Sequence, residues 1–179
     1  MLKLLFDIVF SIIGLIVCLP IIILVLVVIL LVERKNPFFV QNRMGYKKSE
    51  FKIIKFRTMI EGKITPIGNV LRRTGIDELP QLLNILSADM SFVGPRPLTT
   101  NDIDRLGWNT DYYNLRWNVR PGIAGLGQLS PICNAHMSWL YDKTYVRNKS
   151  LWLDLKIIFS SFAILFVGKS KVKTWIHKR

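Results

Sequence analysis

The most prominent pattern in the sequence is an apolar run near the N-terminus. From Ile8 to Val32 no charged residue interrupts 25 consecutive positions. A straight helix of that length would measure about 37 Å, against a bilayer core of about 30 Å. A secretory signal peptide would have a shorter apolar region ending in small residues, whereas this run ends in Glu33-Arg34-Lys35. The pattern therefore predicts a helix that holds the mature protein on a membrane.

Pro20 lies in the middle of this run and leaves its geometry open. A proline cannot donate a hydrogen bond to the carbonyl four residues earlier and also crowds that carbonyl, so a break or kink is expected. Each half, about 12 residues or about 18 Å, could pass mid-membrane and return to the same face as a re-entrant hairpin. The alternative is a kinked spanning helix. Composition alone favours the span, because proline is common in spanning helices.

The polar and apolar positions after the run predict a small mixed domain. Residues 38–42 and 51–59 are expected to form strands around a polar turn at 45–49. Lys52, Lys55 and Arg57 are interleaved with apolar residues in the second strand. They form either a solvated face or a surface for phosphates or headgroups.

Two further segments are expected to be helical. Leucines at positions 79, 82, 83 and 86 predict an amphipathic helix of about three turns. The stretch from Leu151 to Val167 predicts a helix that is interfacial or part of the core, because its longest uncharged part, 11 residues from Ile157, is too short to span. A basic, Trp-containing tail at 169–179 is expected to lie on anionic headgroups or to be a frayed terminus.

Positive charge dominates the chain. The 179 residues include 25 lysines and arginines against 12 acidic residues, a net charge of +13, which implies an anionic partner: a phosphorylated small molecule, anionic lipid or nucleic acid. Cations gather just after the apolar run, which predicts a cytoplasmic C-terminal side. The cysteines and histidines have no disulfide or metal-ligand spacing, and we assign no chemistry to Cys18, Cys133, His136 and His177.

The candidate chemistry lies where the leucine-striped helix begins. Pro80 is tolerable only in the first turn of a helix, so Asp77 and Glu78 should sit at its N-terminus. Free amides and the helix dipole favour anions there, and adjacent residues point about 100° apart. One carboxylate could thus face a substrate phosphorus while the other holds a divalent cation. The alternative is a capping arrangement, with Thr74 and Asp77 in Thr-x-x-Asp spacing.

Two arginines elsewhere are placed beside prolines. Arg96 stands in Gly94-Pro95-Arg96-Pro97 and Arg120 in Arg120-Pro121-Gly122. Proline restricts the neighbouring backbone and so holds a planar, permanently charged donor fork in place. Arginines and magnesium are what neutralise the like charges when a carboxylate attacks a diphosphate. Otherwise, each arginine belongs to a surface turn.

Taken in order, these motifs resemble the bacterial sugar transferases, and among them the small monotopic phosphoglycosyl transferases. The resemblance covers nearly the whole chain and begins with an apolar helix broken at proline, although Leu19-Pro20 stands where Ser-Pro is usual. The strings that follow are Lys55-Phe56-Arg57-Thr58-Met59, Arg72-Arg73, Asp77-Glu78-Leu79-Pro80-Gln81, Asp89-Met90-Ser91-Phe92-Val93-Gly94-Pro95-Arg96-Pro97 and Arg120-Pro121-Gly122. The chain departs from the family pattern around Ser130 to Asn134, so the resemblance does not indicate which sugar is used.

The resemblance implies a reaction and a site. Asp77 would attack the sugar-proximal phosphate of a UDP-sugar, releasing UMP, and undecaprenyl phosphate would then collect the sugar phosphate. Glu78, with Asp77, would hold Mg²⁺, while Arg72, Arg96 and Arg120 would lie near the phosphates. Bacterial inner-membrane lipids would be partners, nucleic acid would not, and a homodimer is compatible with the pattern.

The expected fold is α+β and mainly helical. Residues 1–35 would form a re-entrant helix-break-helix anchor with its break at Leu19 and Pro20, and residues 36–179 a compact catalytic domain on the cytoplasmic face, with interfacial amphipathic helices. The resemblance and Pro20 together favour the re-entrant arrangement over the span. The rival functions are a non-catalytic basic adaptor that binds anionic lipid or nucleic acid, and a polyprenol-linked glycosyltransferase that would release UDP.

Overall fold

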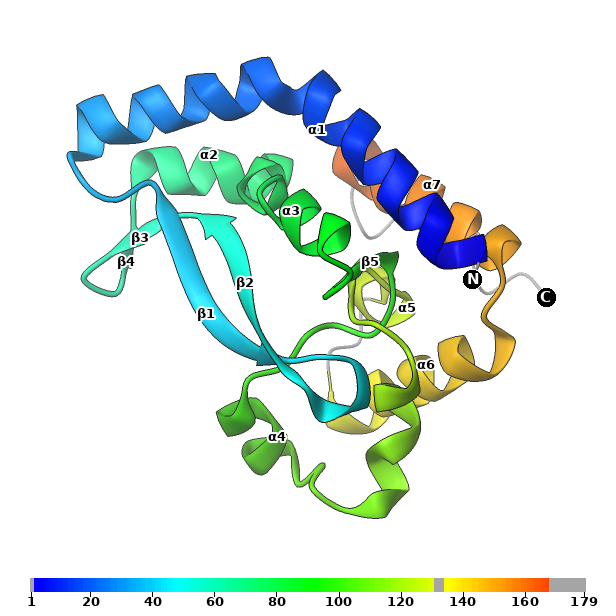
Figure 1. Cartoon of the computed structure of the whole chain (residues 1–179). Coiled ribbons are helices and arrows are strands. Elements are labelled where there is room, and N and C mark those ends of the chain that lie inside the picture. Colours follow the sequence, from blue (N-terminus) through cyan, green and yellow to red (C-terminus); the bar gives the residue numbers. More distant parts are fainter. Residues whose placement is uncertain (1, 131–133, 168–179) are drawn as a thin grey trace. The chain divides into compact units, whose positions relative to one another are not determined.

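The structure is a computed structural model that describes residues 2–130 and 134–167 (Figure 1). It is mostly helical, as the sequence predicts, and it contains three two-stranded sheets among the described residues. The elements, in chain order, are α1 (Leu2–Val28), η1 (Ile29–Glu33), β1 (Phe38–Met44), η2 (Tyr46–Lys48), β2 (Glu50–Phe56), β3 (Met59–Ile60), β4 (Lys63–Ile64), α2 (Pro66–Thr74), η3 (Ile76–Glu78), α3 (Gln81–Leu86), β5 (Ser91–Val93), α4 (Thr100–Leu106), η4 (Asp111–Asn118), β6 (Gly122–Ala124), α5 (Leu126–Leu129), α6 (Ala135–Asn148) and α7 (Leu151–Val167).

The chain forms two compact units. The first comprises residues 1–42 and 52–88, and the second comprises residues 43–51 with the described part of 89–179. The predicted anchor segment and the acidic pair therefore belong to the first unit. The second unit carries Arg96 and Arg120.

Helix α1 is long and apolar enough to cross a membrane by length and composition. It runs without interruption through Leu19 and Pro20, so the predicted separation into two helices is not observed. A proline removes a single intrahelical hydrogen bond, and a helix can relieve the ring clash by bending. Figure 1 shows α1 as one continuous ribbon that bends along its length.

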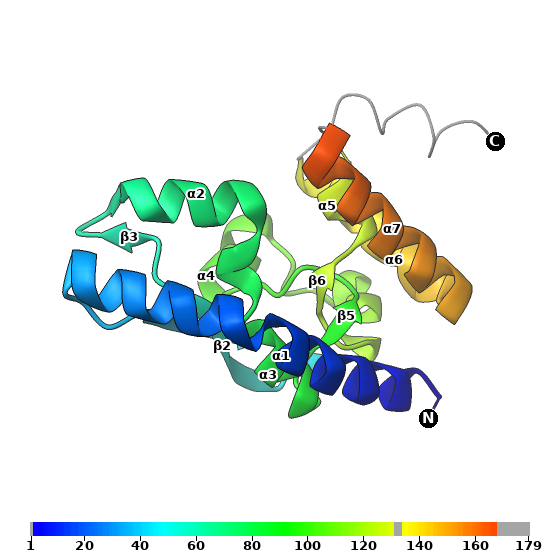
Figure 2. The same ribbon diagram turned by 90° about the horizontal axis from the view of Figure 1, so that it is seen from above.

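One face of α1, continued by the first residue of η1, is buried in the structure. Asp7, Ser11, Val25 and Ile29 are buried and recur at helical spacing along this face. Gly14 lies on the same face, where an added Cβ would stand 3.4 Å from a methyl group of Leu82 in α3. Figure 2 shows α1 running over α3. The remaining surface of α1 exposes large aliphatic side chains along its length.

The core of the first unit joins α1 to the sheet and to α2. Val25 and Ile29 pack with Phe56 of β2 and Leu71 of α2, and the ring of Phe38 in β1 stacks on that of Phe56. Thr65 begins α2 by accepting a hydrogen bond from the Gly68 amide, with Pro66 in the first turn. This cluster fixes the end of α2, from which the acidic pair follows.

The predicted strand from 51 to 59 is shorter in the structure. It ends at Phe56, and Met59–Ile60 instead pairs with Lys63–Ile64 in a separate small hairpin. The Thr58 side chain between them is buried and accepts a hydrogen bond from Arg72, which draws the chain away from the β1–β2 sheet. The predicted hairpin of β1 and β2 is otherwise confirmed.

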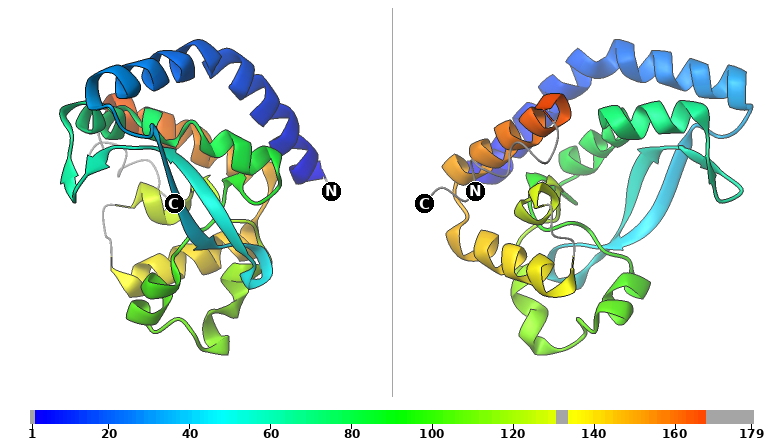
Figure 3. Two further views of the ribbon diagram at one scale, coloured as in Figure 1. Left: turned by 60° about the vertical axis from the view of Figure 1, so that its left-hand side comes forward. Right: turned by 180° about the vertical axis from the view of Figure 1, so that it is seen from behind.

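The second unit is built around a short parallel pair of strands. Ser91 pairs with Gly122 and Val93 with Ala124. One core cluster joins this pair to α5, α6 and α7 through Val93, Leu129, Tyr145, Val146 and Ile157. A second cluster is rich in tryptophan and contains Leu98, Ile103, Trp108, Trp117 and Trp139. Figure 3 shows α6 and α7 joined by a short turn.

The predicted helix from Leu151 to Val167 is confirmed as α7. It has a core face, because Ile157 is buried in the first of these clusters and the buried Asp154 carboxylate hydrogen-bonds to the Tyr145 hydroxyl at 2.8 Å. Its other side exposes Trp152, Phe159 and Phe162. An interfacial role for that side remains a prediction. The basic tail after residue 167 lies outside the described residues.

Candidate active site

Asp77 and Glu78 lie in a short turn between two helices. Gly75 ends α2 in a left-handed conformation, with φ of 73°, and opens the 3₁₀ turn η3 that carries both carboxylates. Pro80 follows as the N-cap of α3, which confirms its predicted place at the beginning of a helix. The leucine pattern is only partly confirmed, because Leu82 is buried whereas Leu83 is exposed.

The alternative in which Thr74 caps this helix is wrong. The Thr74 hydroxyl donates to the carbonyl oxygens of Val70 and Leu71 within its own helix, at 2.9 and 3.1 Å. Gly75 rather than Thr74 precedes the turn, and it provides no side-chain cap. A threonine hydroxyl at the end of a helix can donate to a backbone carbonyl one turn earlier. Here the Thr74 hydroxyl forms that hydrogen bond instead of capping the next helix.

Two cations of the first unit lie beside the acidic pair. The Nζ of Lys55, in β2, is 2.6 Å from Oε1 of Glu78. Both side chains are partly exposed, at 20% for Lys55 and 30% for Glu78. Arg72 lies in the last turn of α2, and its Nε donates to the Thr58 hydroxyl at 2.8 Å, which fixes the start of its guanidinium group. Arg72 is also near enough for its charge to act on Asp77.

The environment of Asp77 opposes ionisation of its side chain. Partial burial is the largest cause that raises the pKa of Asp77, and the neighbouring Glu78 charge raises it further. The charges of Lys55 and Arg72 act in the opposite direction but do not cancel the rise. Asp77 is thus a carboxylate held between desolvation and two cations, an arrangement typical of sites that carry out chemistry.

The donor set at this position fits a hard divalent cation shared with a phosphorylated ligand. Asp77 and Glu78 supply carboxylate oxygens, and no third acidic, His or Cys side chain joins them among the described residues. Mg²⁺ is commonly bound by one or two carboxylates together with substrate phosphates and water. One oxygen of Glu78 already accepts a hydrogen bond from Lys55, so Lys55 and a cation would compete for it.

The segments that carry the other two predicted arginines lie side by side in the second unit. Pro95 accepts a hydrogen bond from the Gly122 amide, which joins the two Arg-Pro segments directly. Gly94 must lack a side chain, because an added Cβ would lie 2.2 Å from the Arg120 carbonyl oxygen. The guanidinium of Arg120 lies over the Tyr46 ring, 5.6 Å from its centre. The parallel pairing of β5 and β6 thus brings the Arg96 and Arg120 motifs together.

The sequence reasoning missed Lys55 as a member of the site. It had grouped Lys55 with Lys52 and Arg57, although only Lys55 contacts Glu78. The available signal was its position in the Lys55-Phe56-Arg57-Thr58-Met59 string, which also supplies the partner of Arg72. Arg57 instead donates to the carbonyl oxygens of Asn36 and Phe38 and holds the base of the hairpin.

A sequence model described as "Bacterial sugar transferase" matches residues 1–168. The chain belongs to this family. It is 33% identical over 161 residues to a UDP-N-acetylgalactosamine-undecaprenyl-phosphate N-acetylgalactosaminephosphotransferase of Aeromonas hydrophila, an alignment that covers 78% of this chain and 38% of the relative. It is also 33% identical to a UDP-glucose:undecaprenyl-phosphate glucose-1-phosphate transferase of Klebsiella pneumoniae, covering 92% of this chain and 40% of the relative.

A relative of similar size is the exopolysaccharide production protein ExoY of Sinorhizobium fredii. It is 32% identical over 195 residues, which covers 92% of this chain and 85% of the relative. The chain spans only about two fifths of the length of the Aeromonas and Klebsiella proteins. The matched region includes the acidic pair, the Arg-Pro motifs and all of α1.

Proposed function

We propose that this bacterial sugar transferase transfers a sugar 1-phosphate from a UDP-sugar to undecaprenyl phosphate and releases UMP. The observation that carries the proposal is the Asp77–Glu78 pair beside Lys55 and Arg72, in a chain of this family. Relatives named as undecaprenyl-phosphate sugar phosphotransferases support the same substrates. The reaction would be the first membrane step of a bacterial glycoconjugate, such as capsule, O-antigen, exopolysaccharide or glycoprotein.

Asp77 is the nucleophile in this proposal. One of its carboxylate oxygens forms a bond to the sugar-proximal phosphorus, and the bond from that phosphorus to the UMP oxygen breaks, so that UMP leaves with the electron pair. An oxygen of undecaprenyl phosphate then attacks the same phosphorus and Asp77 leaves as a carboxylate. The product is an undecaprenyl diphosphate-linked sugar. Lys55 and Arg72 favour the ionised form of Asp77 that the first step requires.

Glu78, with Asp77, would hold Mg²⁺. The bound ion would neutralise negative charge that builds up on the diphosphate. Glu78 also orients Lys55 through their 2.6 Å contact. Arg72, Arg96 and Arg120 would bind substrate phosphate, each with a planar donor fork suited to phosphate oxygens.

The packing of α1 and η1 within the first unit supports a membrane geometry. Gly14 lies against Leu82 of α3, and Val25 and Ile29 pack in the core of the same unit. A helix that crossed the bilayer would draw these packed elements into the hydrocarbon. This favours a re-entrant segment, residues 1–35, that enters and leaves by the cytoplasmic face. Residues 36–179 would then form the catalytic domain on that face of the inner membrane, with α7 at the interface. Inner-membrane lipids would cover the exposed aliphatic side of α1, and the protein could work as a homodimer.

The direct test of the nucleophile is Asp77→Asn. This variant should remain folded and membrane-bound and should release no UMP from UDP-sugars, because an amide cannot form the phosphosugar bond. Asp104→Asn is the matched control, since Asp104 is a carboxylate whose described contact is a hydrogen bond from Asn109. Undiminished UMP release by Asp77→Asn would rule out this assignment. Trapping of a labelled sugar phosphate on Asp77 would support it most directly.

The products separate the proposal from its rivals. A glycosyltransferase that moves the sugar without its phosphate would release UDP rather than UMP. A basic adaptor would bind anionic lipid or nucleic acid with an affinity that falls steeply with salt and is indifferent to loss of Asp77 or Glu78. In this proposal nucleic acid is not a partner.

The topology can be tested by labelling a cysteine at position 2. In a variant with Leu2→Cys, Cys18→Ser and Cys133→Ser, reagents confined to the outer face should leave residue 2 unlabelled. The same protein should be labelled once the membrane is permeabilised. Labelling from the outer face of intact membranes would instead support the spanning arrangement.

A further inference from the structure

The turn that carries Arg96 has few backbone N–H groups with which to form hydrogen bonds. It lies between the end of β5 at Val93 and the start of α4 at Thr100. Pro95 and Pro97 have no backbone N–H, so Arg96 supplies the only amide donor of the three residues. A segment of this kind is fixed mainly through its carbonyl oxygens.

Each of the three carbonyl oxygens accepts a hydrogen bond from a different element. The Pro95 oxygen accepts from the Gly122 amide of β6 at 3.0 Å. The Arg96 oxygen accepts from Nη2 of Arg116 in η4 at 2.9 Å. The Pro97 oxygen accepts from Nη1 of Arg43 in β1 at 3.2 Å. Two of the three donors are therefore arginine side chains that reach the turn from outside the β5–β6 pair.

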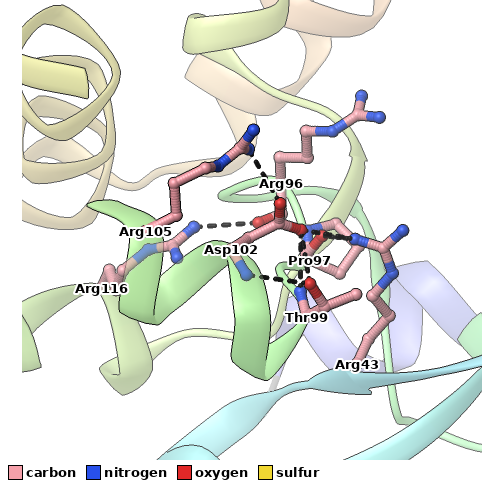
Figure 4. Close-up of polar contacts among 7 residues, drawn as sticks. All are labelled: Arg43, Arg96, Pro97, Thr99, Asp102, Arg105 and Arg116. Carbon is pink, nitrogen blue, oxygen red and sulfur yellow. Dashed lines mark hydrogen bonds and ion pairs between the residues drawn. The ribbon is translucent and has the colours of Figure 1, made fainter. Parts of the chain in front are cut away.

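Arg43 is itself held by a carboxylate at the start of α4. Its Nη1 lies 3.3 Å from Oδ2 of Asp102. Asp102 is fixed in turn by a capping box with Thr99, in which the Thr99 side chain accepts from the Asp102 amide and the Asp102 carboxylate accepts from the Thr99 amide. Figure 4 shows these contacts converging on Asp102. Arg105 also pairs with Asp102 at 3.0 Å, but its side chain is 76% exposed.

Arg116 is held more tightly, inside the tryptophan-rich cluster. Its Nε donates to Oδ2 of Asp142 in α6 at 3.1 Å, and its side chain is 2% exposed. The guanidinium carbon lies 4.9 Å from the centre of the Trp108 ring and 4.6 Å from that of Trp117. A buried arginine so confined is a fixed donor, because it has lost the rotational freedom of an exposed one.

Arg96, in contrast, presents its side chain to the surface. It is exposed between two buried prolines. Figure 4 shows its guanidinium directed away from the Asp102 carboxylate, which Arg43 and Arg105 contact. Because the backbone is held at three successive carbonyls, the point and direction in which this side chain leaves the backbone are set before any ligand arrives.

We infer that Arg43 and Arg116 are positioning residues, which hold the Pro95–Pro97 turn so that the Arg96 side chain leaves the backbone toward substrate phosphate. This inference rests on the proposed phosphate-binding role of Arg96. Neither Arg43 nor Arg116 touches substrate, and each acts through the backbone of Arg96. Their effect on the reaction should therefore disappear when the Arg96 side chain is removed.

The test is a double-mutant cycle on kcat/KM for UMP release. Arg43→Met keeps the apolar stem but removes the donor, and it should lower kcat/KM by roughly 10-fold, within the range expected when a binding group is misplaced. In an Arg96→Met background the same change should cost less than about twofold, because effects that run through one residue do not add. Arg43→Lys restores a donor and should recover most of the loss.

Arg105→Met is the matched control for charge. It removes a second arginine from Asp102 without touching the turn, and kcat/KM should stay within about twofold of the unmodified protein. Equal losses from Arg43→Met in the two backgrounds, or an equal loss from Arg105→Met, would overturn the inference. Arg116→Met should repeat the Arg43 pattern if that variant folds.

Amide hydrogen exchange tests the same inference without a measurement of catalysis. Peptides covering residues 94–99 should exchange about 10-fold faster in Arg43→Met than in the unmodified protein or in Arg105→Met. Unchanged exchange would refute the positioning role whatever the activity. If the unmodified protein released no UMP while exchange behaved as expected, the proposed reaction would fail and the backbone role of the two arginines would stand.

Discussion

Two ion pairs in this molecule show how differently charge can be used. Lys55 and Glu78 approach to 2.6 Å, yet their side chains remain 20% and 30% exposed beside Asp77. Arg116 and Asp142 are separated by 3.1 Å, and their side chains are 2% and 10% exposed beneath the Arg96 turn. The shorter pair is the more accessible one.

This difference in exposure determines what each ion pair can contribute. Burial raises the pKa of Asp142 to about 6 despite the opposing charge of Arg116, which shows how strongly this site disfavours an isolated charge. The Asp142 side chain holds the Arg116 guanidinium, which donates to the Arg96 carbonyl. Breaking the Lys55–Glu78 contact costs less free energy, because water can solvate both side chains once they separate. This pair is therefore suited to a site where a diphosphate and a cation must enter.

The largest effect should follow from breaking the buried pair. Asp142→Ala leaves the Arg116 guanidinium buried without its carboxylate, and the free energy of unfolding should fall by about 3–5 kcal/mol. Asp142→Asn retains an oxygen acceptor and should cost less. Denaturant unfolding of the purified protein in detergent measures both.

Glu78→Ala is the comparison for that measurement. Its partner Lys55 can turn toward solvent, so the loss of unfolding free energy should stay below about 1 kcal/mol. If Glu78→Ala were as destabilising as Asp142→Ala, the distinction between a structural pair and an accessible pair would be wrong.

Only part of this comparison could be predicted from the sequence. The apolar helix, the β1–β2 hairpin, the start of α3 and the extent of α7 carry local signals, because a turn or a helix face is encoded within a few residues. Arg116 and Asp142 are 26 positions apart and neither lies in a motif. Their pairing depends on the packing of η4 against α6, which no local pattern encodes.

The burial of one face of α1 was also beyond the sequence reasoning. Asp7 lies just before the uncharged run and Ser11 within it, and the apolar pattern assigns neither of them a role. In the structure both are buried, and Gly14 on the same face allows the approach of Leu82. A polar and small-residue stripe at positions 7, 11 and 14 was the signal that could have found this face.

The next effect in size should be on activity without loss of stability. Glu78→Gln keeps the shape of the side chain but removes the charge that would hold Mg²⁺, and UMP release at a fixed Mg²⁺ concentration should fall on the order of 10²-fold. The Mg²⁺ concentration for half-maximal release should rise, while the unfolding free energy stays within about 1 kcal/mol. A chelator should abolish release by the unmodified protein, and added Mg²⁺ should restore it. Full activity in the chelator would remove the metal from the proposal.

The smallest effect expected is a shift of the pH profile, and it tests the accessible pair directly. Asp77 must be ionised to attack phosphorus, so release should increase as pH rises through its pKa, which burial and the Glu78 charge place above the ordinary value for aspartate. Lys55 lowers that pKa, so Lys55→Met should move the acid limb to higher pH. Glu78→Gln removes a like charge and should move the limb to lower pH. Two partners of one ion pair should thus shift the same limb in opposite directions.

Arg73→Met is the control for that shift, because Arg73 is an exposed cation next to Arg72 that is not among the charges acting on Asp77. The acid limb of the pH profile of Arg73→Met should coincide with that of the unmodified protein. The raised pKa also makes the free energy of unfolding depend on pH. The folded state prefers protonated Asp77, so this stabilising contribution is present below the ordinary aspartate pKa and is lost as pH rises through the raised value. The ionised form that attacks is then the less stable one, and Asp77→Asn should remove that part of the pH dependence of unfolding. A limb that moves in the same direction in Lys55→Met and Glu78→Gln would show that the ion pair does not control Asp77.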